Sequence, residues 1–338
     1  MSNPPAICVA GGGSWGTALA HHCAGLGHDV ALWLRDEAAA RHINDKHENP
    51  RYLRGFPLHE KLAATTDVKA LGREIVICAV PCQQLRGWLG AHKSRFVPGV
   101  ALVNAAKGIE TQTRALGHAV VADVDRTIRY VALSGPSFAA EVARGQPTAV
   151  VLAGSDEALV RRLQEIFSAA AFRCYASADV IGVEMGGALK NVMAIAAGLC
   201  DGLELGLNSR AALITRGLAE MSRVGVACGA KEHTFMGLSG LGDLVLTCTG
   251  QLSRNRQAGL RLARGESADA IAADLGMVVE GIKTTLAAFA LARELGQETP
   301  IIDAVYNIIQ NRLDPRKEVT RLMGRTLKNE RMSAPDGA

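Results

Sequence analysis

A glycine-rich turn between an apolar run and a helical segment constrains the fold of this chain more than any other feature. The run AICVA spans residues 6–10, and Gly11, Gly13 and Gly16 follow it in the pattern G-x-G-x-x-G. An Ala/Leu-rich segment of helix length and a second apolar run, at residues 30–34, come next. This order is typical of a dinucleotide-binding unit, in which the glycines allow a tight turn and the helix N-terminus holds a pyrophosphate. The alternative is a glycine turn that serves only helix-to-strand packing.

Strand-length apolar runs continue to alternate with amphipathic segments through the first half of the sequence. The further runs lie at residues 75–80, 100–103, 130–133, 149–153 and 172–175. Near-continuous apolar runs suit strands that are buried on both faces of a parallel sheet. We therefore predict an α/β fold with an N-terminal Rossmann-like doubly wound sheet, and we expect Ser14 to cap its first helix.

From about Asp179 the strand pattern gives way to helical periodicity. The helical segments are residues 180–199, 210–228, 268–275, 282–295 and 302–311. The pattern predicts a dinucleotide-binding domain over residues 1–178, an all-helical substrate and catalytic domain over residues 179–330, and a flexible polar tail over residues 331–338.

Composition excludes several classes of protein. The net charge of +4 is too small to attract a polyanion such as a nucleic acid, and 48% hydrophobic residues argue against disorder. The eight cysteines form no C-x-x-C pair or zinc pattern, so we expect reduced thiols, no metal and a cytoplasmic protein. The N-terminus lacks the basic region of a signal peptide. The apolar stretch 185–199 contains a lysine and is shorter than the ~20 residues of a spanning helix, so no membrane insertion is expected.

The end of the second predicted strand bears on the choice between NADP and NAD. An acid at this place takes the ribose 2′-OH of NAD, whereas an arginine pairs with the 2′-phosphate of NADP. The chain offers both, because Arg35 directly follows the strand and Asp36 comes next. We expect NADP(H) to be preferred and NAD(H) to be accepted; the alternative for Arg35 is an ordinary surface arginine.

Lys190 is the only ionisable residue in the apolar stretch MGGALKNVMAIAAGL, residues 185–199. Burial of an ammonium among apolar neighbours lowers its pKa, which makes a lysine an effective acid and base near neutral pH. The alternative is a lysine whose head group reaches water from an amphipathic helix. Asn191 adds a second polar group at this otherwise apolar place.

Three further segments offer groups for an anionic substrate. Lys107 lies in NAAKGIE, which follows a predicted strand, and Asp243 ends the glycine-rich GLSGLGD, where its carboxylate is placed to hold a protonated lysine. The segment SRNR, residues 253–256, combines a helix N-cap with two guanidinium groups and an amide, which suits a phosphate monoester. The alternatives are a solvated loop lysine, a capping aspartate and an exposed, charged first turn.

At these residues the sequence resembles the cytosolic NAD(P)-dependent glycerol-3-phosphate dehydrogenases of the bacterial type. The resemblance covers essentially the whole chain and rests on six motifs in the family's order. They are GGGSWGTALA from Gly11, NAAKGIE from Asn104, SGPSFAAEVARGQPTA from Ser134, GGALKNVMAIAAG from Gly186, GLSGLGDLVLTCTGQLSRNR from Gly237 and VVEGIKT from Val278.

The resemblance implies a homodimeric dehydrogenase that acts on a CH–OH group and interconverts sn-glycerol 3-phosphate and dihydroxyacetone phosphate for phospholipid synthesis. It implies that Lys190 transfers the proton, with Lys107 and Asp243 as further catalytic residues. The implied substrate contacts are Lys107, Gly135, Ser137, Lys190, Asp243, Ser253, Arg254 and Asn255. The implied cofactor contacts are Gly11, Gly13, Ser14, Trp15, Gly16, Arg35, Tyr52, Lys107, Ala139, Arg254, Val278 and Glu280. Position 35 varies between His and Arg in the family, and position 137 is often Thr.

Two other classes of protein share part of this pattern. A β-hydroxyacid dehydrogenase has the same glycine turn and a helix-borne lysine, but its lysine and asparagine are separated by three residues, whereas Lys190 and Asn191 are adjacent. A nucleotide-sensing module without catalysis has the glycines but no need for a lysine in an apolar helix.

Overall fold

The computed structural model describes residues 4–274 and 279–327, and these residues form two compact units. Of the described residues, those up to Ala106 and Gly117–Val180 form the N-terminal unit, and Lys107–Leu116 and those from Ile181 onward form the C-terminal unit. Leu275, the end of a predicted helix, and Val278, a predicted cofactor contact, lie outside the described residues, as does the predicted tail.

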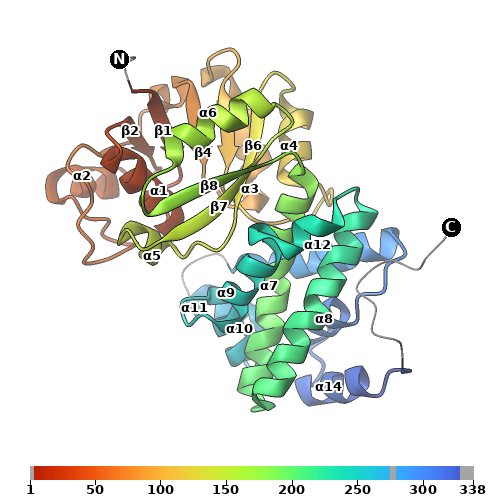
Figure 1. The fold of residues 1–338 in the computed structure, drawn as a ribbon. Coiled ribbons are helices and arrows are strands. Elements are labelled where there is room, and N and C mark those ends of the chain that lie inside the picture. Colours follow the sequence, from red (N-terminus) through yellow and green to blue (C-terminus); the bar gives the residue numbers. More distant parts are fainter. Residues whose placement is uncertain (1–3, 275–278, 328–338) are drawn as a thin grey trace. The chain divides into compact units, whose positions relative to one another are not determined.

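The N-terminal unit is built on one eight-stranded sheet in the order β3-β2-β1-β4-β5-β6-β7-β8 (Figure 1). Neighbouring strands are parallel except β6 and β7, which are antiparallel. The strands are β1 (Ala6–Ala10), β2 (Asp29–Trp33), β3 (Ala63–Thr65), β4 (Ile75–Cys78), β5 (Ala101–Asn104), β6 (Arg129–Ser134), β7 (Thr148–Ala153) and β8 (Phe172–Ser177). The predicted doubly wound sheet is confirmed, and it gains the short strand β3 and one antiparallel pair.

Helices connect these strands. They are α1 (Ser14–Gly25), α2 (Glu37–Lys46), α3 (Cys82–His92), α4 (Gly117–Val124), α5 (Ala139–Ala143) and α6 (Glu157–Phe167), with short 3-10 turns at Val68–Gly72 and Lys93–Arg95. The strand order reverses at β1, with β2 on one side and β4 on the other. Because parallel crossovers are right-handed, this reversal places α1 and α2 on one face of the sheet and α3 and α4 on the other. The carboxyl ends of β1 and β4 therefore flank the switch point where such sheets bind ligands.

The described part of the C-terminal unit is helical, as predicted. Its helices are α7 (Val180–Gly202), α8 (Gly206–Ala227), α9 (Asp243–Thr249), α10 (Arg254–Ala263), α11 (Ala268–Asp274), α12 (Glu280–Glu294), α13 (Pro300–Gln310) and α14 (Pro315–Met323). A 3-10 turn at Glu232–Met236 and a π-helical turn at Leu238–Gly242 precede α9. Helical periodicity identified α7, α8, α11, α12 and α13 but not α9 or α14, and of α10 the sequence analysis predicted only the N-cap.

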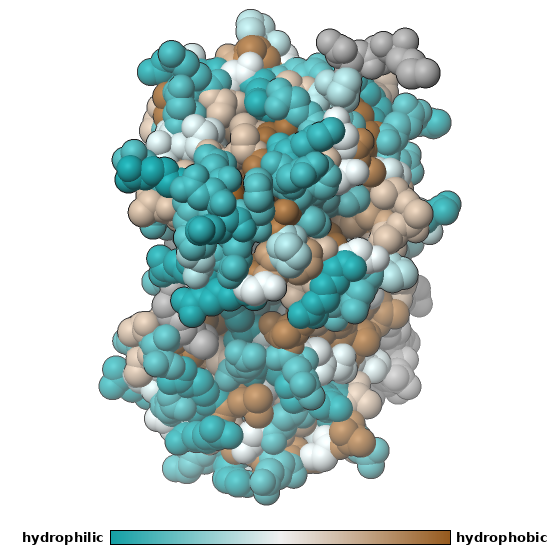
Figure 2. Space-filling view, turned by 90° about the vertical axis from the view of Figure 1, so that its left-hand side faces the viewer, coloured by the Kyte–Doolittle hydropathy of each residue, from teal (hydrophilic) through white to brown (hydrophobic). Residues whose placement is uncertain are grey.

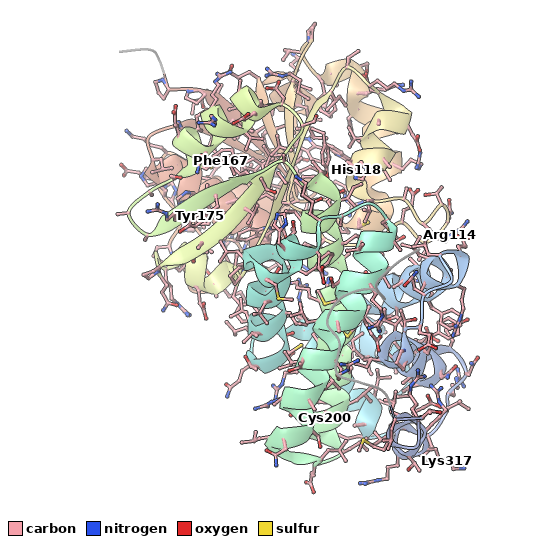
Figure 3. All side chains as sticks on the ribbon, turned by 45° about the vertical axis from the view of Figure 1, so that its right-hand side comes forward. Arg114, His118, Phe167, Tyr175, Cys200 and Lys317 are labelled. Carbon is pink, nitrogen blue, oxygen red and sulfur yellow. The ribbon has the colours of Figure 1, made fainter. Side chains whose placement is uncertain are left out.

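Helix α7 forms the core of the C-terminal unit. Every residue from Met185 to Cys200 is buried, and Figure 3 labels Cys200 near the C-terminal end of the helix. With 23 residues, α7 is longer than its predicted apolar stretch and is long and apolar enough to cross a membrane. However, 83% of its most apolar window is buried inside the protein, and a core helix passes the same test of length and composition.

On the face drawn in Figure 2, hydrophilic side chains dominate and apolar ones are scattered among them.

Helix α10 approaches α7 so closely that their backbones are in contact. A Cβ atom at Gly198 would lie 2.0 Å from the carbonyl oxygen of Arg256, and one at Gly259 would lie 2.1 Å from that of Ile195. No side chain fits at either place, so these glycines permit the crossing. Asp201 at the end of α7 also pairs with Arg256 at 2.6 Å. The beginning of α10 is thus held against the helix that carries Lys190.

The segment Lys107–Leu116 belongs to the C-terminal unit, although the sequence analysis placed it in the first domain. Its Ile109 and Leu116 are part of the second apolar core. Arg114, labelled in Figure 3, pairs with Glu294 of α12 at 2.8 Å. Strand and helix periodicity cannot reveal this assignment, because it depends on which core a loop packs against.

Candidate active site

Lys190 lies in the middle of α7 with only 7% of the residue exposed. Its ammonium donates to Oδ1 of Asp243 at 2.5 Å and to Oγ1 of Thr247 at 2.9 Å. Burial lowers the pKa of Lys190 to about 8; the charge of Asp243 opposes this effect and that of Lys107 reinforces it. The lysine is therefore an ion-paired core residue rather than one that reaches water along a helix surface.

Asp243 is the first residue of α9 and directly follows the π-helical turn. It is 1% exposed and bridges two lysines, because its Oδ2 accepts from Nζ of Lys107 at 2.6 Å. Burial alone would raise the pKa of Asp243, but the ammonium groups of Lys107 and Lys190 outweigh it and lower that pKa. The structure thus brings together three residues that lie up to 136 positions apart in the sequence.

Thr247 completes this cluster, and the sequence analysis did not identify it. Its hydroxyl donates to the backbone carbonyl of Asp243 at 2.6 Å and accepts from Lys190. Residues four apart share one face of a helix, so the spacing of Asp243 and Thr247 on α9 was the available signal. The buried ammonium of Lys190 has two fixed oxygen partners as a result.

A second cluster of polar groups is centred on Asn255 of α10. Its amide donates to Oδ1 of Asn191 at 2.8 Å and accepts from the backbone N–H of Gly281 at 3.0 Å, so it joins α7, α10 and α12. Ser253 is the N-cap of α10, as predicted, and its hydroxyl accepts from the N–H of Arg256 at 3.2 Å. This places Arg254 at the first helical position, beside the N–H groups of the helix terminus.

Glu280, at the start of α12, responds to the same charges. Burial raises the pKa of Glu280, and the charges of Arg254, Lys107 and Lys190 act against this rise. Arg254 exerts the largest of the three electrostatic effects on it. The C-terminal unit therefore contains one electrically coupled group formed by three basic and two acidic residues.

The glycine turn of the N-terminal unit fits a dinucleotide. Gly11 has a φ of +119°, and a Cβ at Gly16 would lie 1.9 Å from the carbonyl oxygen of Gly11, so both positions require glycine. Gly13 is the N-cap of α1, which corrects the prediction of Ser14, and no side chain caps the helix. A Cβ at Gly13 would meet no atom within 4 Å, and the indole N–H of Trp15 is buried with no partner among the described residues. Open space, uncapped N–H groups and an unused donor suit a bound pyrophosphate.

Arg35 and Asp36 differ in their surroundings. Asp36 caps α2, with its carboxylate accepting from the N–H of Ala39 at 3.0 Å. Arg35 is exposed two residues beyond the end of β2. The carboxylate of Asp36 is therefore already used as a helix cap, whereas the side chain of Arg35 is exposed to solvent.

The other predicted contacts in the N-terminal unit lie on loops and a helix start. Gly135 has a φ of +134° and follows β6, and the hydroxyl of Ser137 donates to its carbonyl at 3.0 Å. Ala139 is the first residue of α5. The ring of Tyr52 lies under the guanidinium of Arg51, 5.5 Å away.

Comparison with known proteins identifies the family. The model of the NAD-dependent glycerol-3-phosphate dehydrogenase N-terminus matches residues 6–160, and that of the C-terminus matches residues 179–320. The chain belongs to this family. A relative from Desulfovibrio desulfuricans, named glycerol-3-phosphate dehydrogenase [NAD(P)+], is 62% identical over 98% of the chain and 100% of its own length. The family predicted from the six motifs is confirmed.

Solved structures agree with this membership. A crystal structure of the glycerol-3-phosphate dehydrogenase from Coxiella burnetii matches with a TM-score of 0.90 at 40% identity, covering 94% of this chain and 98% of that one. A yeast glycerol-3-phosphate dehydrogenase matches with a TM-score of 0.79 at 27% identity, covering 94% and 99%. A ketopantoate reductase family protein from Ralstonia eutropha shares only the fold, with a TM-score of 0.59 at 17% identity over 93% and 99%. The prediction of a nicotinamide-dependent dehydrogenase with this fold is therefore confirmed.

Proposed function

We propose that Lys190 transfers the proton as this chain interconverts dihydroxyacetone phosphate and sn-glycerol 3-phosphate. The observation that carries the proposal is the buried cluster in which Asp243 bridges Lys190 and Lys107, at 2.5 and 2.6 Å. A lysine with a pKa of about 8 can both give and take a proton near neutral pH.

The chemistry divides between the cofactor and the chain. The reduced nicotinamide, when bound, supplies the hydride that adds to C2 of the ketone. Lys190 gives one proton to the oxygen on C2, which becomes the hydroxyl of glycerol 3-phosphate, and is left as a neutral amine. Asp243 and Thr247 hold Nζ in place in both states, and Lys107 keeps Asp243 ionised. In oxidation the neutral amine of Lys190 accepts the hydroxyl proton, so this direction accelerates as pH rises through the pKa of Lys190.

The phosphate group is anchored by Arg254, Asn255 and the N–H groups at the start of α10. A guanidinium beside a helix N-terminus suits a phosphate monoester, because it offers a planar pair of donors and a favourable dipole. By family resemblance Gly135, Ser137 and Ser253 also contact the substrate. An anchor remote from C2 orients the carbonyl for both transfers.

The turn that contains Gly11, Gly13 and Gly16, with Ser14 and Trp15, would hold the pyrophosphate of the cofactor. Arg35 pairs with a 2′-phosphate, so NADP(H) is preferred over NAD(H); the use of Asp36 as a helix cap supports this choice. By resemblance the further cofactor contacts are Tyr52, Lys107, Ala139, Arg254, Val278 and Glu280. We also propose a cytoplasmic homodimer that supplies phospholipid synthesis. None of its eight cysteines, all of which lie in the part of the chain that the structure describes, forms a disulfide, which is consistent with a reducing compartment.

A coupled absorbance assay tests the function. The purified protein should oxidise NADPH with dihydroxyacetone phosphate and be inactive with ketopantoate. Lys190→Met, which keeps the length of the side chain but carries no proton, should lower kcat by about 10²–10⁴-fold while NADPH binding stays near that of the wild type. Lys317→Met is the matched control, because Lys317 is an exposed lysine on α14 (Figure 3). Retention of more than about a tenth of the wild-type kcat in Lys190→Met would assign the proton to another group.

A further inference from the structure

Asn49 connects the glycine turn to the loop that follows α2. It is 2% exposed, and its amide nitrogen donates to the carbonyl oxygen of Gly12 at 3.1 Å and to Oγ1 of Thr17 at 2.9 Å. Its Oδ1 accepts from the backbone N–H groups of Arg51 at 3.1 Å and Tyr52 at 2.9 Å. All four hydrogen-bonding positions of the side-chain amide are thus used.

The bond to Gly12 fixes the direction of a neighbouring N–H group. In a planar trans peptide the C=O of one residue and the N–H of the next point in opposite directions. Since the Gly12 carbonyl points to Asn49, the Gly13 N–H points away from it. A Cβ at Gly13 would have no atom within 4 Å, so this residue borders open space. That N–H is one of the donors that a pyrophosphate at this turn requires.

The same side chain orders the loop that contains Tyr52. Two consecutive N–H groups of this loop converge on Oδ1 of Asn49, which fixes the backbone at Tyr52. A second attachment lies further along, where the N–H of His59 donates to Nδ1 of His21 on α1 at 2.9 Å. The ring of His21 also meets that of Phe56 edge to face at 5.1 Å. The loop is therefore attached to α1 through Asn49 and through His59, and Asn49 also holds the glycine turn.

We propose that Asn49 is a positioning residue for the cofactor: it orients the peptide between Gly12 and Gly13 for the pyrophosphate and holds Tyr52 beside it. The inference rests on the proposed cofactor site at the glycine turn. No other side chain of this size provides two donors and an acceptor here. Aspartate keeps the acceptor but loses both donors and places a negative charge beside the turn, and alanine loses every bond.

The experiment compares Asn49→Ala with Asn44→Ala, a matched control. Asn44 also bridges backbone groups through its amide, donating to the carbonyl of Ala64 at 2.9 Å and accepting from its N–H at 2.7 Å, but it has no contact with the glycine turn. Asn49→Ala should raise the Kd of NADPH and of ADP, which carries a pyrophosphate, by about tenfold or more, whereas the Kd of 2′-AMP should change less. The KM for NADPH should rise while kcat at saturating cofactor stays within about twofold of the wild type.

Asn49→Asp and Thr17→Val separate positioning from folding. Asn49→Asp keeps the loop bonds and should still lose NADPH affinity, because it no longer holds Gly12. Thr17→Val keeps the shape of a buried side chain and removes one partner of Asn49, so it should raise the Kd of NADPH severalfold even if Asn49→Ala does not fold. Wild-type affinity in Asn49→Asp and Thr17→Val, or equal affinities in Asn49→Ala and Asn44→Ala, overturns the inference. A wild-type protein that binds no NADPH would instead overturn the cofactor site itself.

Discussion

Replacing Asp243 by asparagine removes the negative charge between Lys107 and Lys190 but keeps the shape of the side chain. In the wild type, burial lowers the pKa of Lys190 to about 8, and the charge of Asp243 prevents a larger fall. Without that charge, burial and Lys107 act unopposed, so the pKa of Lys190 decreases further. An opposite charge at hydrogen-bond distance changes a pKa by about 1 to 3, and we take a decrease of about 2.

This decrease has a defined consequence for each direction of the reaction. At pH 7 a lysine with a pKa of about 8 is about nine-tenths protonated, whereas one with a pKa near 6 is about one-tenth protonated. Reduction of dihydroxyacetone phosphate, which needs the ammonium, should therefore slow about tenfold at pH 7 from protonation alone. Oxidation of glycerol 3-phosphate needs the amine, so its rise with pH should move about two pH units lower.

Initial rates of both reactions between pH 5 and pH 10, at saturating substrates, provide the measurement. Asp303→Asn is the control, because Asp303 is a paired carboxylate of the same unit, 2.7 Å from Arg293, and has no contact with Lys190. The control should keep the wild-type profile. If the oxidation limb of Asp243→Asn stays in place or moves to higher pH, Lys190 is not the group that titrates, or Asp243 does not support its charge.

Two further substitutions test the binding groups. Arg35→Ala should raise the KM for NADPH about tenfold or more and that for NADH little, because a charge-assisted pair with the 2′-phosphate is lost; equal changes in the two KM values would contradict the pairing. Arg254→Lys keeps the charge but loses the planar pair of donors, so kcat/KM for dihydroxyacetone phosphate should fall while the melting temperature is unchanged. An unaltered kcat/KM would remove Arg254 from the phosphate anchor.

The sequence predicted those parts of the fold that depend on local pattern. The glycine turn, the buried strands and the apolar helix around Lys190 each have a characteristic composition or periodicity. Strand β3, with three residues, is too short to show a pattern. The antiparallel direction of β7 depends on the connection 135–147, whose only helix is the five-residue α5. A connection with so little helix differs from the usual parallel crossover, but apolar runs do not record strand direction.

The candidate site was predictable in its members but not in its geometry. Lys190 is visible as a charge in an apolar helix, and the partner role of Asp243 was a reasonable inference from its turn. Asp243 can bridge Lys190 and Lys107 only because the segment Lys107–Leu116 packs with the C-terminal unit, and no local sequence pattern indicates this packing. Thr247 was missed because a threonine in a short helix carries no signal unless its neighbour four residues earlier is already known to matter.

The backbone contact of α7 and α10 at Gly198 and Gly259 has a consequence for which molecules the enzyme accepts. Helices that touch through their main chains cannot separate or slide without losing that fit, and the bond between Asn191 and Asn255 reinforces it. The main chain then fixes the separation of the two helices at Lys190 and at the start of α10, and the side chains of Asp243 and Thr247 hold Nζ of Lys190 in place. With Lys190 as the proposed proton donor and the start of α10 as the proposed phosphate anchor, a three-carbon phosphoester fits only if its carbonyl and phosphate match that separation, so the fixed helix crossing disfavours shorter and longer analogues.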